Sequence, residues 1–261
     1  MTISFDEFVD EAMKILDVNL RGYKIKRVQR RTDSLMRRYN VNNYAQCLEK
    51  LKNDSEFREA YLDHFTINTS EFFRNPQSFK YLEENILPVL LADNKVVNIW
   101  SAPCSNGSEP YTLAIILTEL GYDNSRYRIL ASDIDVGVLE EAKSGIFNEN
   151  AIGNVPPLLL KKYFEEIKGI SMKYKLSQDI INKVSFEYKD LIKEPYEEGW
   201  DLILSRNFFI YLTTEIKEML THKFVEVLKP GGYLFLGNTE FIFTPEKFGL
   251  KKIHSSFYQK I

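Results

Sequence analysis

Cysteine, histidine and long apolar runs are scarce in this sequence, and each scarcity argues against a class of protein. The chain has 261 residues but only two cysteines, Cys47 and Cys104. This speaks against a disulfide scaffold and is typical of a reducing compartment. No Cys or His pair has the spacing of a zinc site, so we expect no metal. No apolar run approaches the ~20 residues that span a bilayer. The first residues lack a basic segment followed by an apolar stretch, so we expect no signal peptide and a cytoplasmic location.

The composition is that of an ordinary globular protein, but the charge is unevenly distributed. Apolar residues make up 44% and charged residues 27% of the chain, and the net charge is −3. Residues 21–38 hold eight basic residues against the single acid Asp33, a net +7, which leaves −10 for the remainder. A solvated helix face is the ordinary interpretation of such a run. Here the excess favours an anionic partner at one place.

The first part of the chain predicts helices only. Ser4 and Glu7 have the spacing of a capping box, and apolar residues follow at helical intervals to Leu16. A second helix carries a stripe of Ile25, Val28, Thr32, Leu35 and Tyr39. Two short helices fit about 42–52 and 55–65, and a linker helix begins at Asn75-Pro76 and runs to about Leu87. We therefore expect a helical domain at 1–70 and a linker at 71–94.

From residue 95 onward, strand and helix patterns alternate. The expected strands are 96–100, 127–133, 184–190, 201–205, 233–237 and 255–261, and the expected helices are 108–120, 135–143 and 213–228. Such alternation predicts a parallel sheet covered on both faces, hence an α/β domain at 95–261. Residues 148–182 fit the alternation poorly and are interpreted as an inserted subdomain.

The turn after the first expected strand favours a cationic ligand. It contains small residues but no G-x-G-x-x-G fingerprint, so a dinucleotide pyrophosphate fits poorly. Glu109, at the start of the next helix, would repel a phosphate. S-adenosylmethionine carries a sulfonium and an ammonium and no phosphate, so it fits better.

Polar residues end the following strands, where ligands bind in open α/β sheets. Asp133 suits a ribose diol, with helix capping as the alternative. Asp190 could accept from an adenine amine, or it could be a solvated loop acid. Arg206 and Asn207 end the fourth strand, and Tyr211 could point to either side.

Five segments together resemble the chemotaxis receptor methyltransferase family. They are WSAPCSNGSEPYTLA at 100–114, SRNFFIYL at 205–212, INTSEFFR at 67–74, ASDID at 131–135 and LKPGGYLFLG at 228–237. The resemblance covers nearly the whole chain. It implies an N-terminal helical domain, a linker and a Rossmann-like class I methyltransferase domain with a small antiparallel β-subdomain.

The resemblance also implies site residues. The implied cofactor contacts are Asn68, Ser70, Arg74, Glu109, Asp133, Asp190, Leu191, Ser205 and Arg206, and the implied active-site residues are Arg74, Arg206 and Tyr211. The family pattern has Glu, Asn and Cys where this sequence has Ser108, Asp190 and Ser205. These departures leave the arginines and the tyrosine in place.

The activity implied by the resemblance is O-methylation of glutamate side chains on bacterial chemoreceptors, with S-adenosylhomocysteine as the other product. A glutamate carboxylate is ionised near neutral pH, so no strong base is needed. Arg74 and Arg206 would orient carboxylates through fork-shaped hydrogen bonds, with a surface ion pair as the alternative for Arg74. Tyr211 would donate to the substrate oxygen or bound the methyl path.

The implied partner is the helical bundle of methyl-accepting chemotaxis receptors, which presents its glutamates on an acidic surface. We expect it to bind the basic residues Lys24, Arg27, Arg30, Arg31, Arg37 and Arg38. We expect membrane contact only through receptors, a monomer, and no nucleic acid. Two rivals remain: a nucleic-acid methyltransferase, although the Asn/Asp-Pro-Pro-Tyr motif is missing, and a binding module that has lost turnover.

Overall fold

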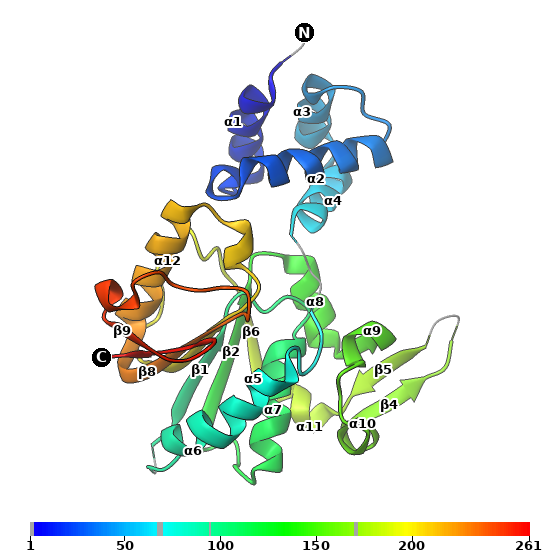
Figure 1. Ribbon diagram of the computed structural model, residues 1–261. Helices are drawn as coiled ribbons and strands as arrows, with labels where there is room; N and C mark the ends of the chain where they lie inside the picture. Colours follow the sequence, from blue (N-terminus) through cyan, green and yellow to red (C-terminus); the bar gives the residue numbers. More distant parts are fainter. Residues whose placement is uncertain (1–2, 67–69, 94, 170–171) are drawn as a thin grey trace. The chain divides into compact units, whose positions relative to one another are not determined.

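The computed structural model describes residues 3–66, 70–93, 95–169 and 172–261, which cluster into two compact units (Figure 1). The first unit comprises Met1–Asn68 and Tyr211–Leu220, and the second comprises Thr69–Ile210 and Thr221–Ile261. Each unit has its own hydrophobic interior and is described by itself.

The first unit is helical throughout its described N-terminal part. Its elements are α1 (Phe5–Leu16), η1 (Leu20–Gly22), α2 (Ile25–Arg38), α3 (Tyr44–Asn53) and α4 (Ser55–Phe65). The predicted capping box starts α1: Ser4 Oγ accepts from the Glu7 N–H at 3.2 Å, and the Glu7 carboxylate accepts from the Ser4 N–H at 2.8 Å. The prediction of four short helices is confirmed.

Helix α2 buries a narrower stripe than the sequence predicts. Val28, Thr32 and Leu35 are buried, but Ile25 and Tyr39 at the two ends are 39% and 38% exposed. Met36 is the buried residue that the stripe missed. The Thr32 hydroxyl is hydrogen-bonded to Tyr61 at 2.8 Å inside the unit, so the one polar member of the stripe is satisfied.

Residues 211–220 join the first unit through main-chain hydrogen bonds. Tyr23 and Leu212 form an antiparallel bridge. The Lys24 N–H donates to the Tyr211 carbonyl at 2.9 Å, and the Thr213 N–H donates to the Gly22 carbonyl at 3.0 Å. The turn before α2 is thereby fixed to this later segment.

The second unit is built on a sheet that, in the described residues, has seven strands in the order β6-β2-β1-β7-β8-β10-β9. Strands β6, β2, β1, β7 and β8 are parallel, and β10 runs antiparallel to both of its neighbours. The bounds are β1 (Val97–Ser101), β2 (Tyr127–Asp133), β6 (Val184–Tyr188), β7 (Trp200–Ser205), β8 (Leu228–Leu236), β9 (Leu250–His254) and β10 (Phe257–Lys260). The expected α/β fold class is confirmed.

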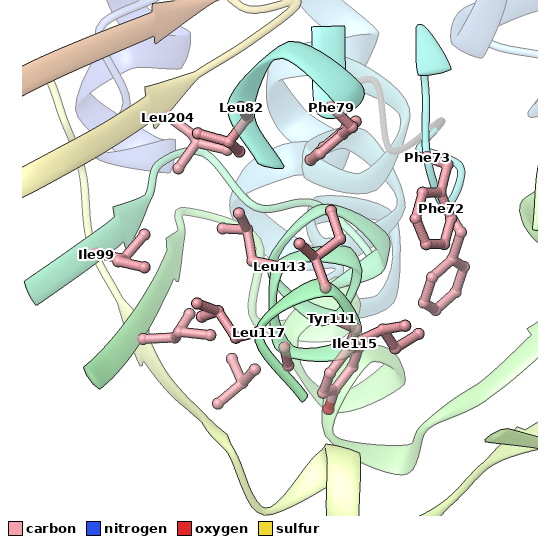
Figure 2. Packing of buried hydrophobic residues seen from close by; sticks show 14 of the residues in the cluster. Phe72, Phe73, Phe79, Leu82, Ile99, Tyr111, Leu113, Ile115, Leu117 and Leu204 are labelled. Carbon is pink, nitrogen blue, oxygen red and sulfur yellow. The ribbon is translucent and has the colours of Figure 1, made fainter. Parts of the chain in front are cut away.

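Helices cover both faces of this sheet because its central strands are apolar on both sides. On one face, Ile99 and Leu204 pack with side chains of α5 (Pro76–Tyr81), η2 (Leu82–Ile86) and α7 (Ser108–Glu119), as Figure 2 shows. On the other face, Trp100 stacks on Trp200 at 5.5 Å and meets Phe224 of α12 (Thr214–Val227) edge-on at 5.7 Å. The remaining helices of the large sheet are α6 (Leu87–Leu90), α8 (Val136–Ser144), η3 (Phe209–Tyr211) and η4 (Pro245–Phe248).

The segment that interrupts the alternation contributes a separate small sheet, in the strand order β3-β5-β4 with antiparallel pairing. Its elements are β3 (Ile146–Asn148), α9 (Glu149–Ile152), α10 (Pro157–Tyr163), β4 (Phe164–Ile167), β5 (Lys173–Leu176) and α11 (Gln178–Ile181). Figure 1 shows β4 and β5 at one side of the second unit. Phe72 anchors this sheet, because its ring meets Phe147 at 4.8 Å and Phe164 at 5.1 Å. The expected antiparallel β-subdomain is therefore present.

Three local features depart from the sequence predictions. The linker helix is continuous from Pro76 to Leu90 rather than ending near Leu87, and Leu82–Ile86 within it is π-helical. Asn75 precedes it in a left-handed conformation and makes no side-chain capping bond. Strand β9 was missed, because it is an edge strand with exposed lysines in place of an apolar run.

Candidate cofactor and methyl-transfer site

The turn between β1 and α7 brings an acid to the carboxyl end of the sheet. Ser101 ends β1, and its hydroxyl donates to Glu109 Oε1 at 2.8 Å. Gly107 has φ +82°, and a Cβ on it would lie 2.9 Å from Ala142 Cβ and 3.0 Å from the Tyr111 ring. Conformation and space therefore both require glycine, and this places Glu109 in the first turn of α7.

Arg206, the residue after β7, is the buried partner of Glu109. Its Nη1 lies 3.1 Å from Glu109 Oε2, and the residue is only 6% exposed. Its Nη2 donates to the Arg74 carbonyl at 2.8 Å and to Asn75 Oδ1 at 2.9 Å. Burial raises the pKa of Glu109 and lowers the pKa of Arg206, while the pairing opposes both shifts. The pair keeps two opposite charges together in a buried position.

Asp133 ends β2 and is 4% exposed. Its Oδ2 accepts from the Ser105 N–H at 2.8 Å, and its Oδ1 accepts from the Asp135 N–H at 3.1 Å. Burial raises the pKa of Asp133 to about 6. The side chain that caps α8 is Asp135, which accepts from the Val138 N–H at 3.0 Å, so the capping alternative for Asp133 is wrong. A carboxylate has about four lone-pair sites, so Asp133 keeps capacity for hydroxyl donors.

Asp190 follows β6 and orders the next loop. It is 5% exposed, so the alternative of a solvated loop acid is wrong. Its Oδ1 accepts from the Ile192 N–H at 2.9 Å and the Lys193 N–H at 3.2 Å. Lys223 of α12 donates to the carbonyl of Leu191 at 2.9 Å, and Leu191 itself is buried. The predicted adenine-side residues thus belong to a loop held from two directions.

Arg74 is the more accessible of the two predicted arginines, with 34% of its side chain exposed. Its Nε lies 4.0 Å from the Glu71 carboxylate, at the outer limit of an ion pair, so the ion-pair alternative stands beside the carboxylate-orienting one. Positive charge on Arg74 also acts on Glu109, whose pKa it lowers. The structure therefore brings Arg74, Glu109 and Arg206 together at one end of the sheet.

Three further residues, Ser70, Ser205 and Asn68, were predicted as cofactor contacts. Ser70 accepts through its main-chain carbonyl from Asn106 Nδ2 at 3.3 Å. Ser205 ends β7 and is fully buried. Asn68 lies outside the described residues.

Tyr211 and the basic helix α2 both belong to the first unit. The Arg27 guanidinium carbon lies 3.8 Å from the centre of the Tyr211 ring. Arg31 donates to the carbonyls of His64 and Thr66 at the end of α4, and burial lowers its pKa. Arg27 and Arg31 thus serve the fold of their own unit, while the predicted receptor-binding residues Lys24, Arg30, Arg37 and Arg38 are exposed.

Three side chains near the rim were not predicted as site residues. Asn75 was interpreted as a helix cap but accepts from Arg206 instead. Asn106 joins the loops at Ser70 and Ser108, accepting from the Ser108 N–H at 3.1 Å. Glu240 is buried and accepts three main-chain N–H groups. Each of these residues also has a partner at least 30 positions away along the chain, and no local sequence pattern reveals such a contact.

Buried polar atoms at this end of the sheet fit a polar ligand. Within the described part of the chain, the hydroxyls of Ser105, Ser108 and Ser205 and the Nε of Arg206 are buried without a hydrogen-bond partner. Such groups cost free energy unless something satisfies them. With the carboxylates of Glu109 and Asp133, this donor and acceptor set suits a cationic ligand that also carries hydroxyls.

The strand order, with one antiparallel strand inserted beside β8, and the acidic carboxyl-end rim define a class I S-adenosylmethionine-dependent methyltransferase fold. The chain belongs to the CheR methyltransferase family. The family's SAM-binding domain matches residues 68–257, and its all-alpha domain matches residues 3–66.

Known relatives agree with this assignment over most of the chain. A chemotaxis protein methyltransferase of Listeria monocytogenes is 34% identical over 94% of this chain and 92% of its own length. One from Borreliella burgdorferi is 34% identical over 86% and 83%. One from Salmonella typhimurium is 34% identical over 77% and 69%.

Among the described residues, no helix has both the length and the apolar character for a membrane span. Nor do they contain a group of three or more His, Cys, Asp or Glu side chains placed to hold a metal ion.

Proposed function

We propose that this chain transfers the methyl group of S-adenosylmethionine to glutamate side chains of methyl-accepting chemotaxis receptors, giving glutamyl methyl esters and S-adenosylhomocysteine. The names of the relatives support a chemotaxis substrate. The observation that carries the proposal is the rim where Glu109, Asp133 and Arg206 lie buried at the strand ends, in a chain that matches both family domains.

Each of the rim residues would bind a different part of the cofactor. Glu109 would attract its positive charge, Asp133 would accept from the ribose hydroxyls, and the Asp190–Leu191 loop would meet the adenine. The unpartnered serine hydroxyls would complete the polar contacts. Bound there, S-adenosylmethionine supplies an electrophilic methyl group.

The remaining task of the chain is to aim the acceptor. A glutamate carboxylate is ionised at neutral pH and needs no proton removed. The two histidines of the second unit are engaged in aromatic packing: His222 packs on Phe248 at 4.7 Å, and His254 stacks on Tyr81 at 3.9 Å. Orientation of the acceptor by Arg74 would act through proximity, which can supply about 7–11 kcal/mol.

The receptor would bind the exposed basic side of α2. Lys26, Arg30 and Arg37 project from the side opposite the buried Val28 and Leu35, because their spacing of four and seven residues places them on one stripe. The acidic helical bundle of a receptor complements this charge. We propose a cytoplasmic monomer that meets membranes only through receptors and binds neither nucleic acid nor metal.

The chemistry of the released methyl group tests this proposal. The protein is incubated with methyl-labelled S-adenosylmethionine and receptor-containing membranes, and the membranes are then treated with alkali. We expect label to appear as volatile methanol, because esters hydrolyse and methylated amines do not. Alkali-stable label would identify an amine acceptor, and no transferred label would identify a binding module; either result would contradict the proposal.

A further inference from the structure

Glu240 is a buried carboxylate whose oxygens are occupied by main-chain donors. Its Oε2 accepts from the Asn207 N–H and from the Gly237 N–H, both at 2.7 Å. Its Oε1 accepts from the Ile210 N–H at 3.2 Å. The residue is 4% exposed. A carboxylate with three such donors has little capacity left for a ligand.

These donors come from the loops after two neighbouring strands. Ser205 of β7 pairs with Leu236 of β8, so the chain leaves both strands at the same level. Asn207 and Ile210 follow β7, whereas Gly237 follows β8. Asn207 has φ +60°, in the left-handed region that asparagine adopts more readily than most residues. The carboxylate therefore links the two loops at a sharp turn of the main chain.

The loop that carries Glu240 is itself fixed. Asn238 Oδ1 accepts from Ser78 of α5 at 2.8 Å and from Ser256 at 2.9 Å. A Cβ on Gly237 would lie 2.5 Å from Glu240 Oε2 and 3.0 Å from the Asn207 nitrogen, so the approach depends on glycine. The loop after β8 is thus fixed by its own contacts. Through Glu240 it restrains the segment that follows Arg206.

We propose that Glu240 is a positioning residue that fixes the turn after β7 and so aims the Arg206 guanidinium at the cofactor side of the rim. Arg206 immediately precedes Asn207, and its fork already spans Glu109, Asn75 and the Arg74 carbonyl. A shift of the Arg206 main chain would break that geometry. The inference rests on the proposed function, because it takes Arg206 to be a cofactor contact.

A double-mutant cycle on S-adenosylhomocysteine affinity tests this assignment. Glu240→Gln keeps the shape but places an NH2 group against at least one N–H donor. We expect it to weaken binding about tenfold in the wild-type background and by less than about twofold in an Arg206→Lys background, because coupled residues are not additive. Equal losses in both backgrounds would overturn the proposal.

A matched control separates position from stability. Asp201, at the other end of β7, accepts from the Asn98 N–H at 2.8 Å and from Lys229 at 2.6 Å. Asp201→Asn also damages a carboxylate link on this strand, so we expect a lowered melting temperature with unchanged affinity. If Asp201→Asn weakens binding as much as Glu240→Gln, the effect is general destabilisation and the proposal is wrong.

A second variant covers the case in which Glu240→Gln does not fold. Gly237→Ala disturbs the same link from the β8 side, and we expect the same dependence on Arg206. Affinity unchanged in Gly237→Ala would contradict the proposal. A wild-type chain that does not bind S-adenosylhomocysteine would overturn the proposed function as well, whereas wild-type binding that survives both variants would overturn only the role of Glu240.

Discussion

At the scale of single residues, the rim is a set of buried carboxylates. Burial raises the pKa values of Glu109, Asp133 and Glu240, and each has hydrogen-bond donors that oppose the shift. A carboxyl whose folded pKa lies above its unfolded value favours folding only while it is protonated, and this contribution is lost as pH rises through the folded pKa. Near neutral pH the ionised carboxylates of the ligand-free rim therefore lower the free energy of unfolding, and a bound cationic ligand offsets this loss.

Cofactor affinity should follow the ionisation of Asp133. With its pKa at about 6, the carboxylate is ionised at pH 7–8 and protonated near pH 5. The ionised form is the better acceptor for two hydroxyls. We expect S-adenosylhomocysteine affinity to fall as pH drops through about 6, measured by calorimetry. Asp133→Asn should bind more weakly and with a flatter pH profile between 5 and 8. An unchanged profile in this variant would remove Asp133 from ribose binding.

Arg74 should act on the chemical step as well as on binding. Loss of an orienting group can cost about 10²-fold, so Arg74→Ala should lower kcat/KM for receptor methylation by that order. Glu71→Gln removes only the ion-pair partner of Arg74 and should leave the rate nearly unchanged. Wild-type rates in Arg74→Ala would favour the surface ion-pair alternative.

At the scale of elements, the helices and strands with a regular apolar pattern were predictable, and those without one were not. The parallel strands β2 and β7 and the helices α1 to α4 follow apolar periodicity and capping signals. Strand β9 does not, because an edge strand with two adjacent exposed lysines lacks an apolar run. Asn75 shows that a tertiary contact can override a local signal. A polar residue before proline predicts a helix cap, but the Asn75 side chain accepts a hydrogen bond from Arg206 instead.

The same limit applies to the site. The position of Glu109, Asp133 and Arg206 at the carboxyl end of the sheet was predictable, because each lies at a recognisable strand end or helix start. Glu240 was not, since its three donors lie at positions 207, 210 and 237 and no local pattern joins them. Burial of Asp190 was likewise invisible in the sequence, where it looks like any loop acid.

The basic stripe of α2 should govern receptor binding alone. Arg31 is not a suitable target for charge reversal, because it hydrogen-bonds carbonyls at the end of α4 and its loss would harm the unit. Lys26, Arg30 and Arg37 are exposed and can be changed instead. We expect Lys26→Glu with Arg30→Glu and Arg37→Glu to raise KM for receptor about tenfold or more. Methylation assays and calorimetry would report KM and cofactor affinity separately.

A control with the same change in charge is needed for this triple variant. Lys95, Lys247 and Lys251 are exposed lysines of the second unit. Their reversal to Glu should leave KM within about twofold, since it changes net charge without touching the stripe. A triple α2 variant that methylates receptors normally would show that this helix is only a solvated face.

The loop after β6 should depend on Lys223. Its ammonium donates to the carbonyls of Leu191 at 2.9 Å and Glu194 at 2.6 Å, and burial lowers its pKa. Lys223→Met removes the ammonium donor of the Glu194 carbonyl and one of the two donors of the Leu191 carbonyl, which also accepts from Tyr196. An unsatisfied buried carbonyl costs about 1–3 kcal/mol. Urea unfolding should show that loss, whereas Glu218→Ala on the exposed side of α12 should not. Equal stability in the two variants would mean that Lys223 does not stabilise the loop after β6.

At the scale of the whole molecule, charge is separated along the chain, with +7 in residues 21–38 and −10 elsewhere. Exposed charges are screened beyond about 8 Å at physiological salt, while buried pairs such as Glu109–Arg206 are screened far less. Receptor methylation should therefore weaken steadily as salt rises, through KM, while S-adenosylhomocysteine affinity changes little. Parallel loss of both with salt would contradict this division of labour.

The central claim is that the carboxyl-end rim of the second unit binds S-adenosylmethionine. Calorimetric titration of the purified, folded chain with S-adenosylhomocysteine tests it most directly. One equivalent should bind, and Glu109→Gln should bind measurably more weakly. No uptake by the folded wild-type chain would contradict the account.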